Sequence, residues 1–257
     1  MGDDGGPEDS RPRRKVYLST YYIDKYEVTN AQYKVFLDKR RKERAEGKKV
    51  RAPAPNCDVK NLTTPEAKQL WNKQEGTFPP EYANHPVTCV SWQMAMMYCE
   101  EQGKKLPTEA QWEKASRGVE GLIYPWGNEW NSKYTNHGLG KSPWVDDSDG
   151  FARTAPIGSF PKDVSPFGVY DMGGNVWEWT RDIYSESYYK WAPLKNPPGP
   201  TIDSLPEKER NLMAPDLLYV IRGGAWALGG DRAKLHQRAS RPKFYRDDAG
   251  GFRCVMD

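Results

Sequence analysis

The stretch FGVYDMGGNVWEWTRD, residues 167–182, decides what fold this sequence can adopt. Its adjacent glycines let the backbone fold back, so that carbonyl oxygens can face inward beside Asp171 and Glu178. Two carboxylates and several carbonyls at a tight turn are the kind of ligands that calcium takes. The same residues also fit a simpler structure, a turn followed by a strand over residues 176–179 whose tryptophans fill a core. The residues alone leave both interpretations open.

The composition predicts many turns and few regular elements. The 257 residues are enough for one large domain or two small ones, and ten tryptophans and fifteen tyrosines can build a core although only 37% of the residues are hydrophobic. The 23 glycines and 21 prolines favour turns and short strands. A net charge of +3 gives no general case for nucleic acid, and no apolar run is long enough for membrane insertion.

Three helices are expected early in the chain, each preceded by a capping residue. They should begin after Thr29, Ser91 and Thr108, and the first and third carry the glutamine that completes a capping box. The third helix should end at Gly118. No helix is expected after that glycine, where loops and short strands should form the rest of the chain.

Helices early and strands late predict one α+β domain over residues 16–257. Residues 1–15 are polar and charged, which indicates a flexible lead-in. Segments near 45–77 and 184–215 resemble insertions. The second is rich in proline and is expected to form a surface loop.

Histidine and cysteine form none of the usual local signatures. His85, His137 and His236 are scattered and show no HExxH spacing, which argues against a histidine-based catalytic metal. None of the four cysteines belongs to a CxxC pair, so a zinc ribbon and a thioredoxin motif are excluded. The cysteines could be buried free thiols or could be joined in a disulfide.

An acidic run, Asp146, Asp147 and Asp149 before Gly150, has the wrong spacing for an EF-hand. The loop could still contribute ligands to a cation site. Paired carboxylates could also serve a glycosidase, but carboxyl groups on one loop do not define a substrate cleft.

A series of motifs in a fixed order resembles the formylglycine-generating enzyme family, also called the sulfatase-modifying-factor domain. The resemblance covers about residues 16–257 and implies a variant C-type-lectin-like fold with little regular secondary structure, held partly by calcium. The motifs are YYIDKYEVTNAQYKVF (21–36), HPVTCVSWQMAMMYC (85–99), KLPTEAQWEKASRG (105–118), YPWGNEW (124–130), GVYDMGGNVWEW (168–179), VIRGGAW (220–226) and GGFRCV (250–255).

The resemblance implies one or two calcium ions, each held by side chains and carbonyls of one region. The ligands of the first site would be Asn136, the carbonyl of His137, Asp149 and the carbonyl of Phe151. Those of the second would be Asp171, the carbonyls of Gly174 and Val176, and Glu178. Both acidic loops suspected from the residues alone thus recur as implied calcium loops.

The resemblance also bears on the cysteines. One family disulfide corresponds to Cys99 and Cys254, and the other corresponds to Ser116 and Arg238, so the second family disulfide is absent. Active members bind copper through two cysteines after the RGG motif, and Leu228 and Ala233 hold those positions here. Copper(I) selects thiolates. We therefore expect no copper, no oxidation of cysteine to formylglycine and no catalytic residue.

Two functions remain open. The first is a non-catalytic, calcium-stabilised binding or accessory module for a protein, peptide or glycan partner. Its surface would mix aromatic and arginine side chains, as binding hot spots do, and would consist of Trp226, Arg232, His236, Arg241 and Tyr245. The alternative is an enzyme of the family with altered, non-copper chemistry, built on His236 with Arg238 and Asp231.

For localisation, the sequence evidence points in two directions. The implied disulfide and the habits of the family favour a secreted, periplasmic or lipid-anchored protein over a cytoplasmic one. Residues 1–15, however, do not have the pattern of a signal peptide. The partner is expected to be neither nucleic acid nor membrane.

Overall fold

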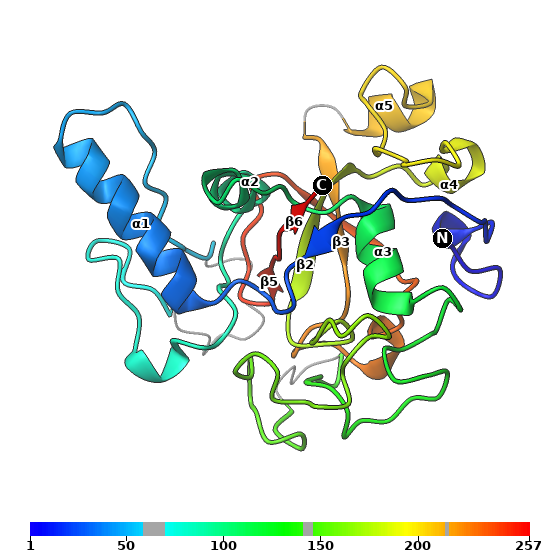
Figure 1. The fold of residues 1–257 in the computed structure, drawn as a ribbon, viewed down its shortest axis with the longest axis horizontal. Helices are drawn as coiled ribbons and strands as arrows, with labels where there is room; N and C mark the ends of the chain where they lie inside the picture. The colour runs from blue at the N-terminus through cyan, green and yellow to red at the C-terminus, as the bar shows by residue number, and fades with distance from the viewer. Residues whose placement is uncertain (59–69, 141–145, 214–215) are drawn as a thin grey trace.

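The computed structural model describes residues 1–58, 70–140, 146–213 and 216–257 as short elements joined by long loops (Figure 1). The helices are α1 (Asn30–Ala45), α2 (Trp92–Glu101), α3 (Glu109–Arg117), α4 (Tyr188–Trp191) and α5 (Glu207–Met213). The strands are β1 (Tyr22–Ile23), β2 (Trp177–Ile183), β3 (Leu218–Arg222), β4 (Ala239–Pro242), β5 (Gly250–Gly251) and β6 (Val255–Met256). This content confirms the α+β class with little regular secondary structure.

Strand β2 lies inside the larger sheet, whose strand order is β4-β3-β2-β5. It pairs antiparallel with β3 and parallel with β5, so Glu178 lies opposite both Arg222 and Gly251. Trp177 and Trp179 are buried on one face of the strand and Glu178 on the other, so both faces are covered. The strand expected over residues 176–179 is confirmed and continues to the end of β2. The sheet therefore brings the glycine turn next to the C-terminal residues.

Helices α1, α2 and α3 begin at the expected caps. The hydroxyls of Thr29 and Thr108 accept hydrogen bonds in complete capping boxes, and Ser91 caps α2. Helix α1 packs an aromatic face on α2, where the ring centroids of Tyr33 and Tyr98 are 5.7 Å apart. These rings belong to the main hydrophobic core, which also contains the tryptophans of β2.

Two disulfides join all four cysteines of the sequence. The expected bond between Cys99 and Cys254 is confirmed and ties α2 to the C-terminal residues. A second bond joins Cys57 to Cys89, a pair that neither the residues nor the family motifs predicted. Disulfides of this kind form in oxidising compartments. Within the described ranges, no helix is both long and apolar enough to cross a membrane.

The expectation that helices end at residue 118 is wrong, because α4 and α5 lie within the segment expected to be a surface loop. Helix α4 forms there because Tyr188 and Tyr189 are buried, and the Tyr188 hydroxyl accepts the N–H of Gly199 at 3.0 Å. Of the other expected insertion, residues 59–69 lie outside the described residues.

Residues 1–15, the expected flexible lead-in, lie at the opposite end of the long axis from α1, beside α3 and α4 (Figure 1). The N–H of Gly2 donates to Glu113 at 2.7 Å, and Arg238 donates to the carbonyl of Asp9 at 2.6 Å. Ser10 is fully buried. These contacts would have to break for the lead-in to move freely. Its flexibility stays a prediction.

Candidate functional site

The turn after β3 carries the two positions where active members of the resembled family have cysteines. Leu228 is half-buried, and its side chain packs on the main core. Ala233 is buried and follows the short 3-10 turn Gly230–Arg232. Both side chains are hydrocarbon, and every cysteine of the chain is in a disulfide. This turn therefore has no thiol with which to bind copper or to react with a substrate thiol.

Two exposed apolar side chains from another loop lie against the same turn. The N–H of Gly138 donates to the carbonyl of Leu228 at 2.9 Å, which places the neighbouring Leu139, 46% exposed, at the turn. A Cβ at Gly230 would lie 2.4 Å from the Trp130 ring, so this glycine leaves room for the indole. Trp130 is itself 37% exposed. The YPWGNEW motif marks Trp130 in the sequence but does not show that its ring reaches this turn.

The binding surface expected around the turn needs correction. Trp226 is 1% exposed, and its indole N–H donates to the carbonyl of Asp248 at 2.9 Å, so this ring is core. His236 is also buried, with Nδ1 3.7 Å from an Asp3 carboxylate oxygen. Of the expected surface residues, Arg232 alone combines exposure with a place in the turn.

The remaining two expected surface residues form a pair elsewhere. The Arg241 guanidinium lies 5.2 Å from the centroid of the Tyr245 ring, and Arg241 is opposite Tyr219 in the pairing of β3 with β4. The polar group suggested for altered chemistry is also not assembled. Asp231 forms an ion pair with Lys234 at 3.0 Å, far out in solvent, whereas Arg238 is buried. Instead, His236 lies beside Asp3, Arg238 pairs with Glu109, and Asp231 pairs with Lys234.

The residues expected at the first calcium site lie close together. The two oxygens of Asp149 accept the N–H groups of His137 at 2.8 Å and Phe151 at 2.9 Å. The Asn136 side chain donates to the carbonyl of Arg153 at 2.8 Å, but its buried Oδ1 has no hydrogen-bond partner among the described residues. A buried acceptor without a donor fits a cation ligand. On this observation the donor set fits calcium.

The second expected site lies at the glycine turn and the start of β2. Asp171 is buried, has a positive φ of 60°, and accepts the N–H of Gly158 at 2.7 Å. Glu178 is buried and accepts the Trp112 indole N–H at 2.9 Å. Arg253 also donates to it through Nε and Nη2, each at 2.8 Å.

Acidic side chains outnumber basic ones around this second site. Glu27 and Asp163 are buried near Asp171 and Glu178, and Arg253 is the buried cation among them. Burial, followed by the charge of Asp171, raises the pKa of Asp163 to about 7. The same burial raises the pKa of Asp171 to about 6. A surplus of buried carboxylates is what a bound cation would neutralise, so this donor set also fits calcium.

Carbonyl oxygens would have to complete either site. Across the described ranges, no group of three or more His, Cys, Asp and Glu side chains is close enough to hold a metal ion. Calcium takes six to eight oxygens and accepts carbonyls and water among them. The carbonyls of His137, Phe151, Gly174 and Val176, which the resemblance implies as ligands, are therefore needed in addition to the side chains.

A second buried group of charges, which the sequence analysis missed, lies under α3. Arg222 donates to Glu109 at 2.6 Å and to Glu113 at 2.9 Å, and Arg238 donates to both oxygens of Glu109. Arg117 completes the group by donating to Glu113 at 3.0 Å. Burial opposes ionisation of Glu113, but Arg222 and Arg117 outweigh it and lower its pKa. We call these five residues the α3 charge cluster.

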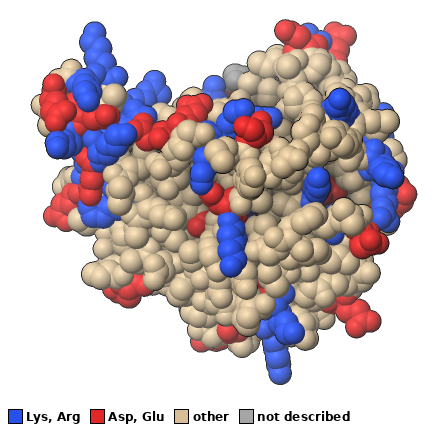
Figure 2. Space-filling view, viewed as in Figure 1, with Lys and Arg blue, Asp and Glu red and all other residues tan. Residues whose placement is uncertain are grey.

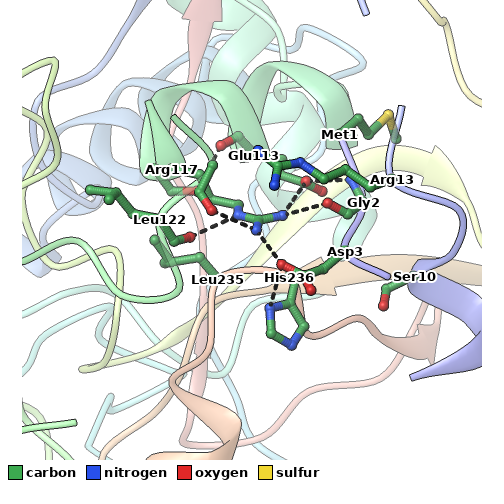
Figure 3. A network of polar contacts seen from close by, with 12 residues as sticks. Met1, Gly2, Asp3, Ser10, Arg13, Glu113, Arg117, Leu122, Leu235 and His236 are labelled. Carbon is green, nitrogen blue, oxygen red and sulfur yellow. Dashed lines mark hydrogen bonds and ion pairs between the residues drawn. The ribbon is translucent and has the colours of Figure 1, made fainter. Parts of the chain in front are cut away.

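The N-terminal residues lie against Glu113 and Arg117 of the α3 charge cluster (Figure 3). Arg117 donates to the carbonyl of Gly2 at 2.9 Å and to the carboxylate of Asp3 at 2.7 Å. His236 lies on the other side of Asp3, and burial lowers the pKa of this histidine. The positions implied for the second family disulfide fall here too, where Ser116 donates to the carbonyl of Glu113 at 3.0 Å.

The sequence comparisons identify relatives along the whole chain. Residues 1–257 match the model of the sulfatase-modifying factor enzyme 1-like domain. The formylglycine-generating enzyme of Mus musculus is 32% identical over 270 residues, which cover 96% of this chain and 68% of that protein. The inactive C-alpha-formylglycine-generating enzyme 2 of Bos taurus is 30% identical over 281 residues, covering 99% of this chain and 84% of that protein.

A solved structure shows the same fold. PvdO from Pseudomonas aeruginosa superposes with a TM-score of 0.70 and 23% sequence identity, over 100% of this chain and 89% of that one. The fold is therefore the formylglycine-generating-enzyme type that the motifs imply. Relatives with and without activity are about equally similar to this chain, so overall identity does not separate the two functions.

Proposed function

Because the chain belongs to the sulfatase-modifying-factor family of formylglycine-generating enzymes, we propose that it is a non-catalytic member, a calcium-stabilised module that binds a protein or peptide partner. The single observation that carries the proposal is the state of its cysteines. All four are in disulfides, and the turn that bears the reactive cysteines of active members carries Leu228 and Ala233. Copper(I) chemistry on a substrate thiol needs a thiolate ligand that this turn does not offer.

The relatives support this proposal without deciding it. One of the most similar is named as an inactive formylglycine-generating enzyme, so loss of activity within this fold has a precedent. An equally similar relative is named as the enzyme itself. The residues at the turn, rather than the degree of similarity, therefore argue for the non-catalytic function.

Calcium in this proposal orders the loops next to the turn. The unpartnered Oδ1 of Asn136 supports the first site, and the carboxylate surplus around Asp171 supports the second. Asn136 is also adjacent to the loop that bonds to Leu228, since Gly138 donates to that residue. A cation bound at Asn136 would thus hold the loop that carries Leu139 against the turn.

The proposed binding surface consists of Trp130, Leu139, Leu228 and Arg232. An indole and two leucines offer apolar contact, and the exposed guanidinium offers a site for a carboxylate of the partner. Aromatic and arginine side chains supply most of the energy at protein interfaces. A peptide segment with an apolar side chain next to an acidic one suits this surface.

The test is affinity capture from a lysate of the native host, with calcium and with a chelator, followed by identification of the retained protein. Trp130→Ala should lose that protein, and so should the chelator. Trp191→Ala is the matched control, because this indole is 39% exposed but lies in α4. A partner retained equally by both variants would contradict the proposed surface. A co-purified glycan, or a small molecule that is turned over, would contradict the proposed partner class.

A further inference from the structure

A pocket of about 620 Å³ lies between β1 and α3 and shares no lining residue with the proposed binding surface at the turn. Its apolar lining includes Tyr22, which is 70% exposed, and Phe167, which is 55% exposed. Tyr21, Ile23 and Val169 line it further. This volume is within the usual range of ligand-binding pockets, about 300–1,000 Å³. Large apolar side chains this exposed, gathered in one hollow, are typical of a binding site.

Two lysines give the pocket its charge. The ammonium group of Lys114 lies 5.8 Å from the ring centroid of Tyr21, and that of Lys25 lies 5.1 Å from the ring centroid of Tyr170. None of the described residues that line the pocket is an aspartate or a glutamate. Figure 2 shows the face over β1 and α3 as mostly uncharged surface with separate basic side chains. The pocket is therefore complementary to an apolar ligand that carries negative charge.

The spacing of the lysines limits the kind of ligand. Lys114 is at the Tyr21 end of the pocket, and Lys25 follows β1 at the other end. Tyr21 and Lys25 lie four positions apart in the chain, which is at most roughly 13 Å of extended backbone. We therefore expect a ligand with two carboxylates, one for each ammonium group. In addition, among the residues that the structure describes, β1 pairs with β6 alone, so it is an edge strand, the kind of element to which an extended peptide can add.

We propose that this pocket binds an extended acidic segment of a partner protein. An aromatic or aliphatic side chain of the segment enters beside Tyr22 and Phe167. Carboxylates on either side of it, about four residues apart, form ion pairs with Lys25 and Lys114. The inference is independent of the proposed function, because it uses neither the turn at Leu228 nor the calcium loops.

The experiment measures the fluorescence anisotropy of a labelled peptide, Gly-Asp-Ser-Phe-Ser-Asp-Gly, titrated with the whole protein. Lys25→Gln and Lys114→Gln should each weaken binding about fivefold. Phe167→Ser should weaken it about tenfold. Lys133→Gln is the control, since this exposed lysine lies in another loop and should leave binding unchanged. Denaturant unfolding of each variant shows that the fold is kept.

Control peptides separate this proposal from simpler ones. A peptide with both aspartates replaced by asparagine, and one with phenylalanine replaced by serine, should each bind about tenfold more weakly. The proposal is overturned if the acidic peptide does not bind at millimolar concentration, or if Lys25→Gln and Lys114→Gln bind it as the unaltered protein does. It is also overturned if phenylacetate competes as well as the peptide, because one carboxylate would then be enough.

Discussion

The protein buries charge in two places, and the balance of charge differs between them. In the α3 charge cluster, Glu109 and Glu113 face three arginines, and each glutamate accepts hydrogen bonds from two of them. Around the start of β2, four buried carboxylates, those of Glu27, Asp163, Asp171 and Glu178, gather near a single arginine among the described residues, Arg253. In the first region, arginine side chains pair with both carboxylates. The second has an excess of negative charge that side chains do not neutralise.

This difference distinguishes buried charges that other side chains neutralise from buried charges that a bound cation would neutralise. A buried carboxylate that forms ion pairs with arginine has a lowered pKa, as Glu113 does. A buried carboxylate without such an ion pair has a raised pKa, as Asp163 does. Both groups are equally buried, so the number of nearby cations decides between them. The comparison predicts that arginine removal damages the first region and that calcium removal damages the second.

The largest effect is expected in the α3 charge cluster. Arg222→Met would leave Glu109 and Glu113 each without one of their buried partners, and unfolding in urea should show a loss of about 3–5 kcal/mol. Lys190→Met is the control, because its ion pair with Glu8 is exposed and should change stability by less than about 0.5 kcal/mol. A loss below about 1 kcal/mol for Arg222→Met would show that this cluster does not depend on its charge balance.

Calcium bound among the carboxylates at the start of β2 should have the next largest effect on stability. At a calcium concentration about one hundred times the dissociation constant, stability should rise by about 3 kcal/mol over the protein in chelator. Asp171→Asn should reduce this gain, whereas Asp231→Asn, a change at a carboxylate that is 92% exposed, should keep it. An equal melting temperature with calcium and with chelator would contradict the comparison.

A smaller, pH-dependent effect is expected from Asp182 at the edge of the α3 charge cluster. Burial, followed by the charge of Glu109, raises the pKa of Asp182 to about 7. The folded protein therefore holds this proton more tightly than the unfolded chain, whose aspartates have a pKa near 3.9. The stability that this proton contributes is present below about pH 4 and is lost as pH rises to about 7.

Asp182→Asn should remove this dependence, because the amide oxygen can still accept the N–H of Glu109. The variant should match the unaltered protein near pH 4 and exceed it by about 2 kcal/mol at pH 8 in urea unfolding. Asp203→Asn, an exposed control, should follow the unaltered protein at both pH values. A variant that is less stable than the unaltered protein at pH 8 would show that Asp182 is ionised and paired there.

The local signals in the sequence predicted helices and strands better than they predicted which side chains are exposed. The caps at Thr29 and Thr108 and the strand at residues 176–179 were predictable, because capping and alternation depend on neighbours in the chain. The Cys99–Cys254 bond followed from the family motifs. Helix α4 was not predictable, because its two buried tyrosines are stabilised by residues far away in the sequence.

The burial of single side chains in the candidate site was beyond the sequence. Trp226 and Arg232 are close neighbours in one turn, yet one is core and the other is exposed. The place of Trp130 beside Gly230 depends on a contact between loops about a hundred residues apart, for which the motifs give no signal. The α3 charge cluster was missed for the same reason, since its acids and two of its arginines come from different parts of the chain.

We propose that this protein has the fold of its family without the thiol chemistry. The most direct test combines two measurements. One is a copper(I) competition titration with a chromophoric chelator, and the other follows the oxidation of a cysteine-containing substrate peptide by mass spectrometry. We expect that the protein withdraws no copper from the chelator and that the peptide cysteine is not converted to formylglycine. Retention of one equivalent of copper together with formylglycine formation would show that the protein is an active oxidase, although neither Leu228 nor Ala233 can supply a thiolate.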